Sequence, residues 1–102
     1  MKNYIIICGL NDKDTRKQEI TTEQATQALA GIVLKYADGA TLTECKGIYK
    51  HEDGGIVFET SIKIEISGIT KENAERIASE AKTALNQESI FFQTLEAQVD
   101  FI

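Results

Sequence analysis

The sequence predicts an α+β domain of the ferredoxin-like βαββαβ plan, with a four-stranded antiparallel sheet and two helices on one face. Three observations predict it: an apolar run at residues 4–8, two helical apolar stripes within 21–37 and 70–85, and two strand-like runs within 41–67. The chain of 102 residues fits a single domain, residues 1–102. Because the first and third predicted strands are the richest in isoleucine, we expect them at the centre of the sheet.

The first half of the chain reads as strand, loop and helix. Residues 3–8 form a strand that is apolar on both faces, and residues 9–20 form a polar loop long enough to be a functional surface. Thr21 and Gln24 have the spacing of a capping box at a helix start. The helix is expected to end near Ala37, and Gly31 within it is expected to mark close packing on the sheet. Its apolar stripe consists of Ala25, Ala28, Leu29, Ile32, Val33 and Tyr36.

The second helix and the last strand follow the central hairpin. Thr70 is the expected N-cap of the helix, and Asn86 is its expected C-terminal stop. The last strand is predicted over residues 89–95. Apolar alternation continues after this strand to the end of the sequence. The residues of the second helix that are predicted to face the sheet are Ala74, Ile77, Ala78, Ala81 and Leu85.

The register of the central hairpin decides which residues share a face. A four-residue loop at residues 51–54 pairs Tyr49 with Ile56 and places both on the core face. A slip by one residue sets Glu44 against Ile62, so we expect the four-residue loop. The second face then gathers apolar and charged side chains and predicts a covering partner, for which a second copy forming a homodimer is one candidate. Its apolar members are Leu42, Ile48 and Val57.

Composition excludes some classes of function. The net charge of −5 opposes direct binding of nucleic acid, whereas an acidic surface either addresses a basic protein partner or keeps the protein soluble. Cys8 and Cys45 lie far apart in apolar runs, which predicts neither a disulfide framework nor a metal site. The apolar run near the N-terminus is too short for a signal peptide or a membrane span, so we expect a cytoplasmic protein that does not bind membranes.

Catalytic and metal-binding motifs are sparse. His51 is the single histidine, and beside Glu52 and Asp53 it is read as a turn residue rather than a metal ligand or catalytic group. The segment from Asn11 to Asp14 starts like a calcium loop but lacks the glycine and glutamate that such a loop requires. The strands do not carry the aromatic pattern of an RNA-recognition module. We therefore expect no catalytic residue, no cofactor and no metal, and a protein that is not an enzyme.

Three stretches carry a resemblance to a known group of proteins: YIIICGLNDKDTRKQEI, TLTECKGIYKHEDGG and LNQESIFFQ. They resemble short acidic proteins encoded by phages and mobile elements of Gram-positive bacteria. Some small acidic proteins from such elements are type II anti-CRISPR proteins, to which this sequence is similar in size and charge. The resemblance implies a non-catalytic inhibitor that binds a CRISPR effector nuclease and blocks guide RNA or DNA loading. It assigns no residue to a site.

The residues themselves supply the candidate contacts for such a protein partner. They are the acidic side chains of the hairpin and its tip, Glu44, Glu52, Asp53, Glu59 and Glu65. The alternative function is a small-ligand-binding or regulatory module that acts as a homodimer through the second sheet face.

Overall fold

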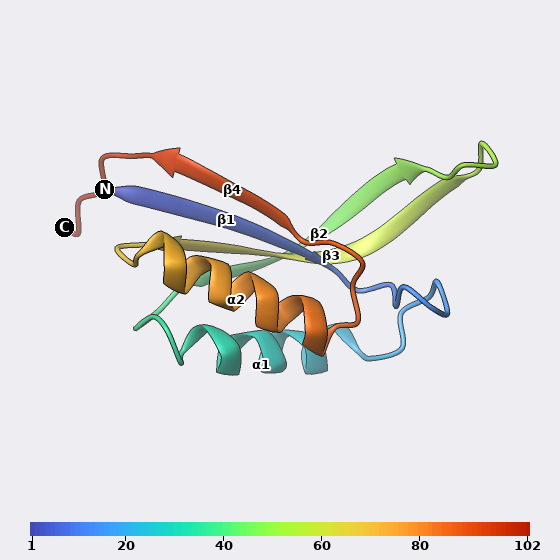
Figure 1. The fold of residues 1–102 in the computed structure, drawn as a ribbon, viewed down its shortest axis with the longest axis horizontal. Helices are drawn as coiled ribbons and strands as arrows, with labels where there is room; N and C mark the ends of the chain where they lie inside the picture. The colour runs from blue at the N-terminus through green and yellow to red at the C-terminus, as the bar shows by residue number, and fades with distance from the viewer.

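The computed structural model describes residues 1–102 and contains four strands and two helices (Figure 1). The sheet is antiparallel with strand order β2-β3-β1-β4, so β1 and β3 are central. Helices α1 and α2 lie side by side beneath one face of the sheet (Figure 1). The predicted ferredoxin-like α+β fold is confirmed. In chain order the elements are β1 (Lys2–Gly9), α1 (Thr22–Val33), β2 (Thr41–Lys50), β3 (Ile56–Ser67), α2 (Lys71–Ala84) and β4 (Phe91–Glu96).

Both helices begin at the predicted caps. Thr21 and Gln24 form a complete capping box, in which each side chain accepts the backbone N–H of the other residue at 3.0 Å. The Thr70 hydroxyl accepts the N–H of Asn73 at 3.1 Å and caps α2. Asn86 follows the end of α2 with a φ of 47°, the left-handed conformation predicted for it.

Helix α1 ends earlier than predicted, at Val33 rather than near Ala37. Its last turn tightens, since the N–H of Tyr36 bonds the Val33 carbonyl at 3.0 Å, a three-residue spacing. Gly31 is exposed, and a Cβ built on it would meet nothing within 4 Å. The prediction that Gly31 marks close packing is therefore wrong.

The core lies between the helices and the even-numbered residues of the central strands. Ile6 of β1 and Ile64 of β3 are opposite each other and fully buried, and Leu29 and Ile77 of the two helices are also fully buried in the core. This parity leaves the odd-numbered side chains of all four strands on the other face, which no helix covers. We call that surface the open face.

The predicted register of the β2–β3 hairpin is wrong by one residue. Ile48 pairs with Phe58 and Glu44 pairs with Ile62, which is the slipped register. The connecting loop has five residues, 51–55, closed by a 2.7 Å bond from the His51 N–H to the Gly55 carbonyl. Glu44 is tolerated opposite a core isoleucine because β2 is an edge strand and its side chain reaches water.

The shifted register exchanges the two predicted faces of β2. Tyr49, predicted to face the core, lies on the open face opposite Val57. Leu42 and Ile48, predicted for the second face, lie on the helix side. The far half of the hairpin extends beyond the helices (Figure 1). As a result Ile48, Ile56 and Phe58 are 63–64% exposed although they share the parity of the core.

The two apolar residues at the end of the tail, Phe101 and Ile102, are also exposed, with Phe101 88% accessible. No helix in the structure has the length and apolar character needed to cross a membrane.

Candidate functional site

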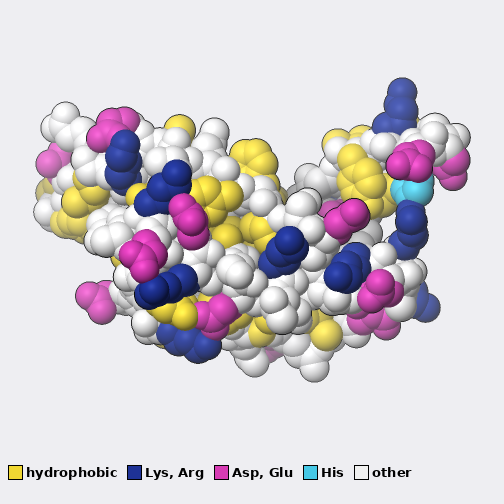
Figure 2. All heavy atoms as spheres, in the orientation of Figure 1, with side chains coloured by type: hydrophobic (Ala, Val, Ile, Leu, Met, Phe, Trp, Pro, Cys, Tyr) yellow, Lys and Arg dark blue, Asp and Glu magenta, His cyan; other side chains and the backbone are white.

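The candidate site is a depression of about 550 Å³ on the open face at the base of the β2–β3 hairpin. Figure 2 shows the surface hollowed between the raised hairpin and the rest of the molecule. The sheet supplies its floor, the loop after β1 and the turn before β4 supply its walls, and the hairpin supplies its far rim. The floor and rim residues are Ile7, Gly9, Tyr49, Val57, Glu59, Ser61 and Phe91. All of them have the odd parity of the open face.

Glu59 is the ionisable side chain on the floor of this depression. Its Oε2 accepts the backbone N–H of Asn11 at 2.8 Å, and the side chain is half-buried. None of the ion pairs in the structure includes Glu59. Its other oxygen, Oε1, accepts no hydrogen bond from the protein. No lysine, arginine or histidine nitrogen therefore lies within 4.0 Å of the Glu59 carboxylate, although Lys13 and Arg16 line the wall of the same depression.

Gly9 creates the space for that carboxylate. A Cβ built on Gly9 would lie 2.5 Å from the Glu59 Cδ and 2.5 Å from each carboxylate oxygen. Carbon atoms in contact are about 3.5–4.0 Å apart, so the Glu59 side chain could not keep its position beside any larger residue.

The loop wall is fixed to the turn between α2 and β4. The Gln87 side-chain amide donates to the Asn11 carbonyl at 2.6 Å, and Gln87 is only 8% exposed. The Asn86 amide donates to Oδ2 of Asp12 at 3.0 Å and to Oδ2 of Asp14 at 2.9 Å. The pKa of Asp12 is lowered, first by the Asn86 hydrogen bond and then by backbone N–H groups of the loop. These contacts occupy the carboxylates that the sequence offered for calcium.

The hairpin tip closes the far side of the depression. His51 contacts the Arg16 guanidinium through Nε2, which joins the tip to the loop after β1. Its Nδ1 lies 3.9 Å from Oδ1 of Asp53. No group of three His, Cys, Asp or Glu side chains converges in the structure in a way that could hold a metal ion.

The predicted partner residues do not share one surface. Glu59 and Glu65 lie on the open face, Glu44 lies on the helix side, and Glu52 and Asp53 lie at the hairpin tip. Glu65 is paired with Lys63 at 3.4 Å, so Glu59 is the unpaired acid of the open face.

The predicted apolar face of Leu42, Ile48 and Val57 is divided in the same way. Leu42 packs on the core and Ile48 is exposed on the helix side, whereas Val57 lines the depression on the open face. The predicted grouping of these three residues is therefore wrong, because it depended on the register.

Sequence reasoning missed most residues of the depression. Tyr49, Ser61 and Phe91 had no assigned role, and Gly9 was noted only as an isolated glycine. The correct register would have found part of the group, since it places Tyr49, Val57 and Glu59 on one face. The contact of Glu59 with Asn11 joins residues 48 positions apart and has no local signal.

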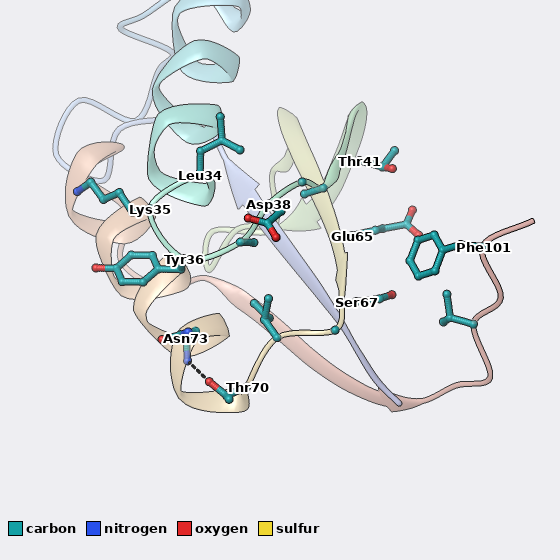
Figure 3. Close-up of a pocket in the computed structure, with 16 residues that line it drawn as sticks. Leu34, Lys35, Tyr36, Asp38, Thr41, Glu65, Ser67, Thr70, Asn73 and Phe101 are labelled. Carbon is teal, nitrogen blue, oxygen red and sulfur yellow. Dashed lines mark hydrogen bonds between the residues drawn. The ribbon is translucent and has the colours of Figure 1, made fainter.

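A second, larger depression of about 910 Å³ lies at the opposite end of the sheet, between the connection after α1, the turn before α2 and the tail. Figure 3 shows its polar side chains spread along the rim, with Phe101 beside Glu65. The Thr70 hydroxyl in it is bonded to Asn73 as a helix cap (Figure 3). Its polar groups thus do not converge on one point.

Comparison with solved structures relates the fold to two groups of proteins. A phage SAM lyase in complex with S-methyl-5'-thioadenosine is 24% identical over 93% of this chain and 80% of that chain, with a TM-score of 0.71. CutA from Synechococcus elongatus is 14% identical over 94% and 77% of the two chains, with a TM-score of 0.62. The periplasmic divalent cation tolerance protein CutA from Archaeoglobus fulgidus is 16% identical over 99% and 88%, with a TM-score of 0.57. No protein-family model and no curated protein match the sequence.

These comparisons correct one prediction. The expectation that the protein is not an enzyme is contradicted, because a phage lyase has the same fold over nearly the whole of this chain. At this identity the likeness shows the fold, and the chemistry has to be argued from the residues of this chain.

Proposed function

We propose that this protein is an S-adenosylmethionine lyase that releases S-methyl-5'-thioadenosine at the depression around Glu59. The observation that carries the proposal is the Glu59 carboxylate, which has no cationic partner and lies on the floor of a depression of about 550 Å³. The fold likeness to a phage SAM lyase solved with S-methyl-5'-thioadenosine supports the choice of substrate.

The side chains around Glu59 suit a sulfonium substrate. S-adenosylmethionine has a positive sulfur, a positive ammonium group and an aromatic base. A carboxylate that forms no ion pair with the protein attracts either cation. Tyr49 and Phe91 are 47% and 53% exposed, so their rings are accessible for stacking on the base or for contact with the cation.

The reaction needs no group from outside the substrate. The substrate carboxylate attacks its own γ-carbon and forms the carbon–oxygen bond of a lactone. The bond from that carbon to sulfur breaks, and sulfur keeps the electron pair as a neutral thioether. The protein's part is to hold the substrate in the folded conformation that this attack requires.

The role of Glu59 follows from the charge changes. The sulfonium loses its charge as the bond breaks, so attraction to Glu59 does not increase in the transition state. Glu59 therefore contributes binding and orientation of the substrate, and its loss is expected to raise KM more than it lowers kcat.

The test is direct. Purified protein is incubated with S-adenosylmethionine, and the thioether is quantified by liquid chromatography and mass spectrometry against the spontaneous decay of the substrate alone. S-adenosylhomocysteine, whose sulfur is neutral, is the control and should remain intact. Thioether formation at no more than the spontaneous rate would contradict the proposal.

A second copy of the chain is the partner that we propose for the exposed apolar surface. Leu95 on the open face is 37% exposed, and Ile48, Ile56 and Phe58 on the hairpin are 63–64% exposed, which is much apolar surface for a small monomer. Light scattering after gel filtration should give a mass above that of one chain. A monomer mass at all concentrations would contradict self-association.

Inhibition of a CRISPR effector nuclease stays a prediction, but the accompanying claim that the inhibitor is not an enzyme is dropped. The accessible acids that favour it are Glu52 and Asp53 at the hairpin tip. Binding to such a nuclease should weaken when these two residues are replaced by lysine and when salt is added. Both this role and cleavage of S-adenosylmethionine require the cytoplasmic location expected from the sequence, which also stays a prediction.

A further inference from the structure

We infer that Gly9 and Asn11 are positioning residues of the site, which hold the Glu59 carboxylate in place and leave its Oε1 available to a cationic ligand. The inference rests on the proposed function, and it goes further by assigning roles to two residues that do not themselves react. Gly9 acts by having no side chain, and Asn11 acts through its backbone N–H.

The glycine at position 9 is explained by space rather than by backbone conformation. Gly54 and Gly68 have φ values of 88° and 78°, which favour glycine. Gly9 is not among the residues with positive φ, and it pairs with Ser61 in the β1–β3 ladder. Its backbone would accept an alanine. The obstacle to a Cβ is the Glu59 carboxylate, 2.5 Å from where that atom would lie.

The group that a methyl would meet is the far end of a flexible side chain. The strand can therefore keep its position while the carboxylate moves away. Gly9→Ala is thus expected to preserve the fold and to displace Glu59. This is the opposite of what a structural glycine predicts, since replacing that type of glycine destabilises the backbone.

The Asn11 N–H fixes the direction of the carboxylate. The chain at this point is held by two further bonds. The Leu10 N–H donates to the Thr60 carbonyl at 3.0 Å, and the buried Gln87 amide donates to the Asn11 carbonyl at 2.6 Å. The N–H is therefore preorganised to meet Oε2 before a ligand arrives.

The first experiment measures S-adenosylmethionine cleavage by Gly9→Ala. We expect KM to rise about tenfold or more, which is the loss typical of a misplaced contact to a charged group. The midpoint temperature of unfolding should change little. Gly31→Ala is the matched control, because a Cβ there meets nothing within 4 Å and should leave KM unchanged.

A double substitution separates displacement of Glu59 from a general effect on the strand. In a Glu59→Ala background the added methyl has no carboxylate to displace, so Gly9→Ala should have no further effect on KM. Additive effects of the two substitutions would overturn the inference. If Gly9→Ala alone does not fold, recovery of folding in the double variant supports the clash, and failure of the double variant contradicts it.

The second experiment does not depend on cleavage. In nitrogen-15 spectra, the amide proton of Asn11 should exchange slowly with solvent because it is bonded to the Glu59 carboxylate, and this exchange should become faster in Glu59→Ala. Gly9→Ala should speed the exchange in the same way, and Gly31→Ala should leave it slow. Slow exchange of the Asn11 amide in Gly9→Ala would overturn the positioning role. If the wild-type protein does not cleave S-adenosylmethionine but the Asn11 amide exchanges as described, the proposed function fails and the positioning of Glu59 stands.

Discussion

Truncation of Ile6 compared with Ile5 tests the assignment of the two sheet faces. Ile6 is fully buried on the helix side, opposite Ile64 on one neighbouring strand and Phe92 on the other. Ile5 is its neighbour on the same central strand, points to the open face and is half-buried. The pair therefore differs mainly in what covers the side chain.

The expected costs follow from the buried carbon atoms. Replacing Ile6 by alanine removes three carbons, about 2.4 kcal/mol at about 0.8 kcal/mol each. A cavity closed by the helices adds to this, so we expect a total of about 3–4 kcal/mol. Ile5→Ala exposes no closed cavity and removes carbons that are only partly covered, for which we expect about 1 kcal/mol.

The assay is urea unfolding followed by circular dichroism, with both variants and the wild type at the same low protein concentration. The midpoint should fall far more for Ile6→Ala than for Ile5→Ala while the slope stays constant. A cost of Ile5→Ala that grows with protein concentration would indicate that a second copy covers the open face. A cost for Ile5→Ala equal to that for Ile6→Ala at low concentration would refute the face assignment.

Three further predictions concern single side chains. Burial raises the pKa of the Cys8 thiol to about 12. At pH 8, iodoacetamide should therefore alkylate the half-buried Cys45 in the native protein and leave Cys8 unmodified until urea is added. Peptide mass spectrometry measures both modifications. The pKa of Asp12 is lowered, chiefly by the hydrogen bond from Asn86, so its carboxylate stabilises the fold above the unfolded-state pKa. This stability is lost as pH falls through the lower folded-state pKa. The difference in urea midpoint between wild type and Asp12→Asn should therefore shrink from about pH 5 to about pH 2, and a constant difference would contradict this expectation. Thr21→Ala removes the capping hydroxyl of α1 and should cost about 1 kcal/mol in urea unfolding, a result that an unchanged midpoint would exclude.

The fold could be predicted because its signals are local. The spacing of apolar residues marks both helices, and the capping box at Thr21 and the left-handed Asn86 lie where the sequence indicates. The central positions of β1 and β3 follow from their isoleucine content, which is the highest among the strands. Each of these inferences needs only neighbours in sequence.

The hairpin register could not be predicted from alternation, for a physical reason. The far half of the hairpin extends beyond the helices, so Ile48 on the helix side and Tyr49 on the open face of β2 are both exposed, at 63% and 47%. Register prediction assigns apolar residues to the face that helices cover, and no helix covers either face in this part of the hairpin. The five-residue loop at 51–55 then shifted every pairing by one.

The site could not be predicted from the sequence because it depends on contacts between residues that are far apart in the chain. Its key contacts join Asn11 to Glu59 and Gln87 to Asn11, 48 and 76 positions apart. Gly9 has no side chain, and its role is visible only from the carboxylate that occupies the space. Such a site requires the register to be known first.

The measurement that tests the central claim most directly compares kcat/KM for S-adenosylmethionine cleavage in the wild type, Glu59→Gln and Glu44→Gln. Both variants remove one carboxylate from the hairpin strands, but Glu44 is exposed on the helix side, away from the depression. We predict that kcat/KM falls about 10- to 100-fold in Glu59→Gln, mostly through KM, because a contact to a charged group is lost. Glu44→Gln should match the wild type. Equal activity of the wild type and Glu59→Gln, or no cleavage by the wild type, would contradict the assignment of this site.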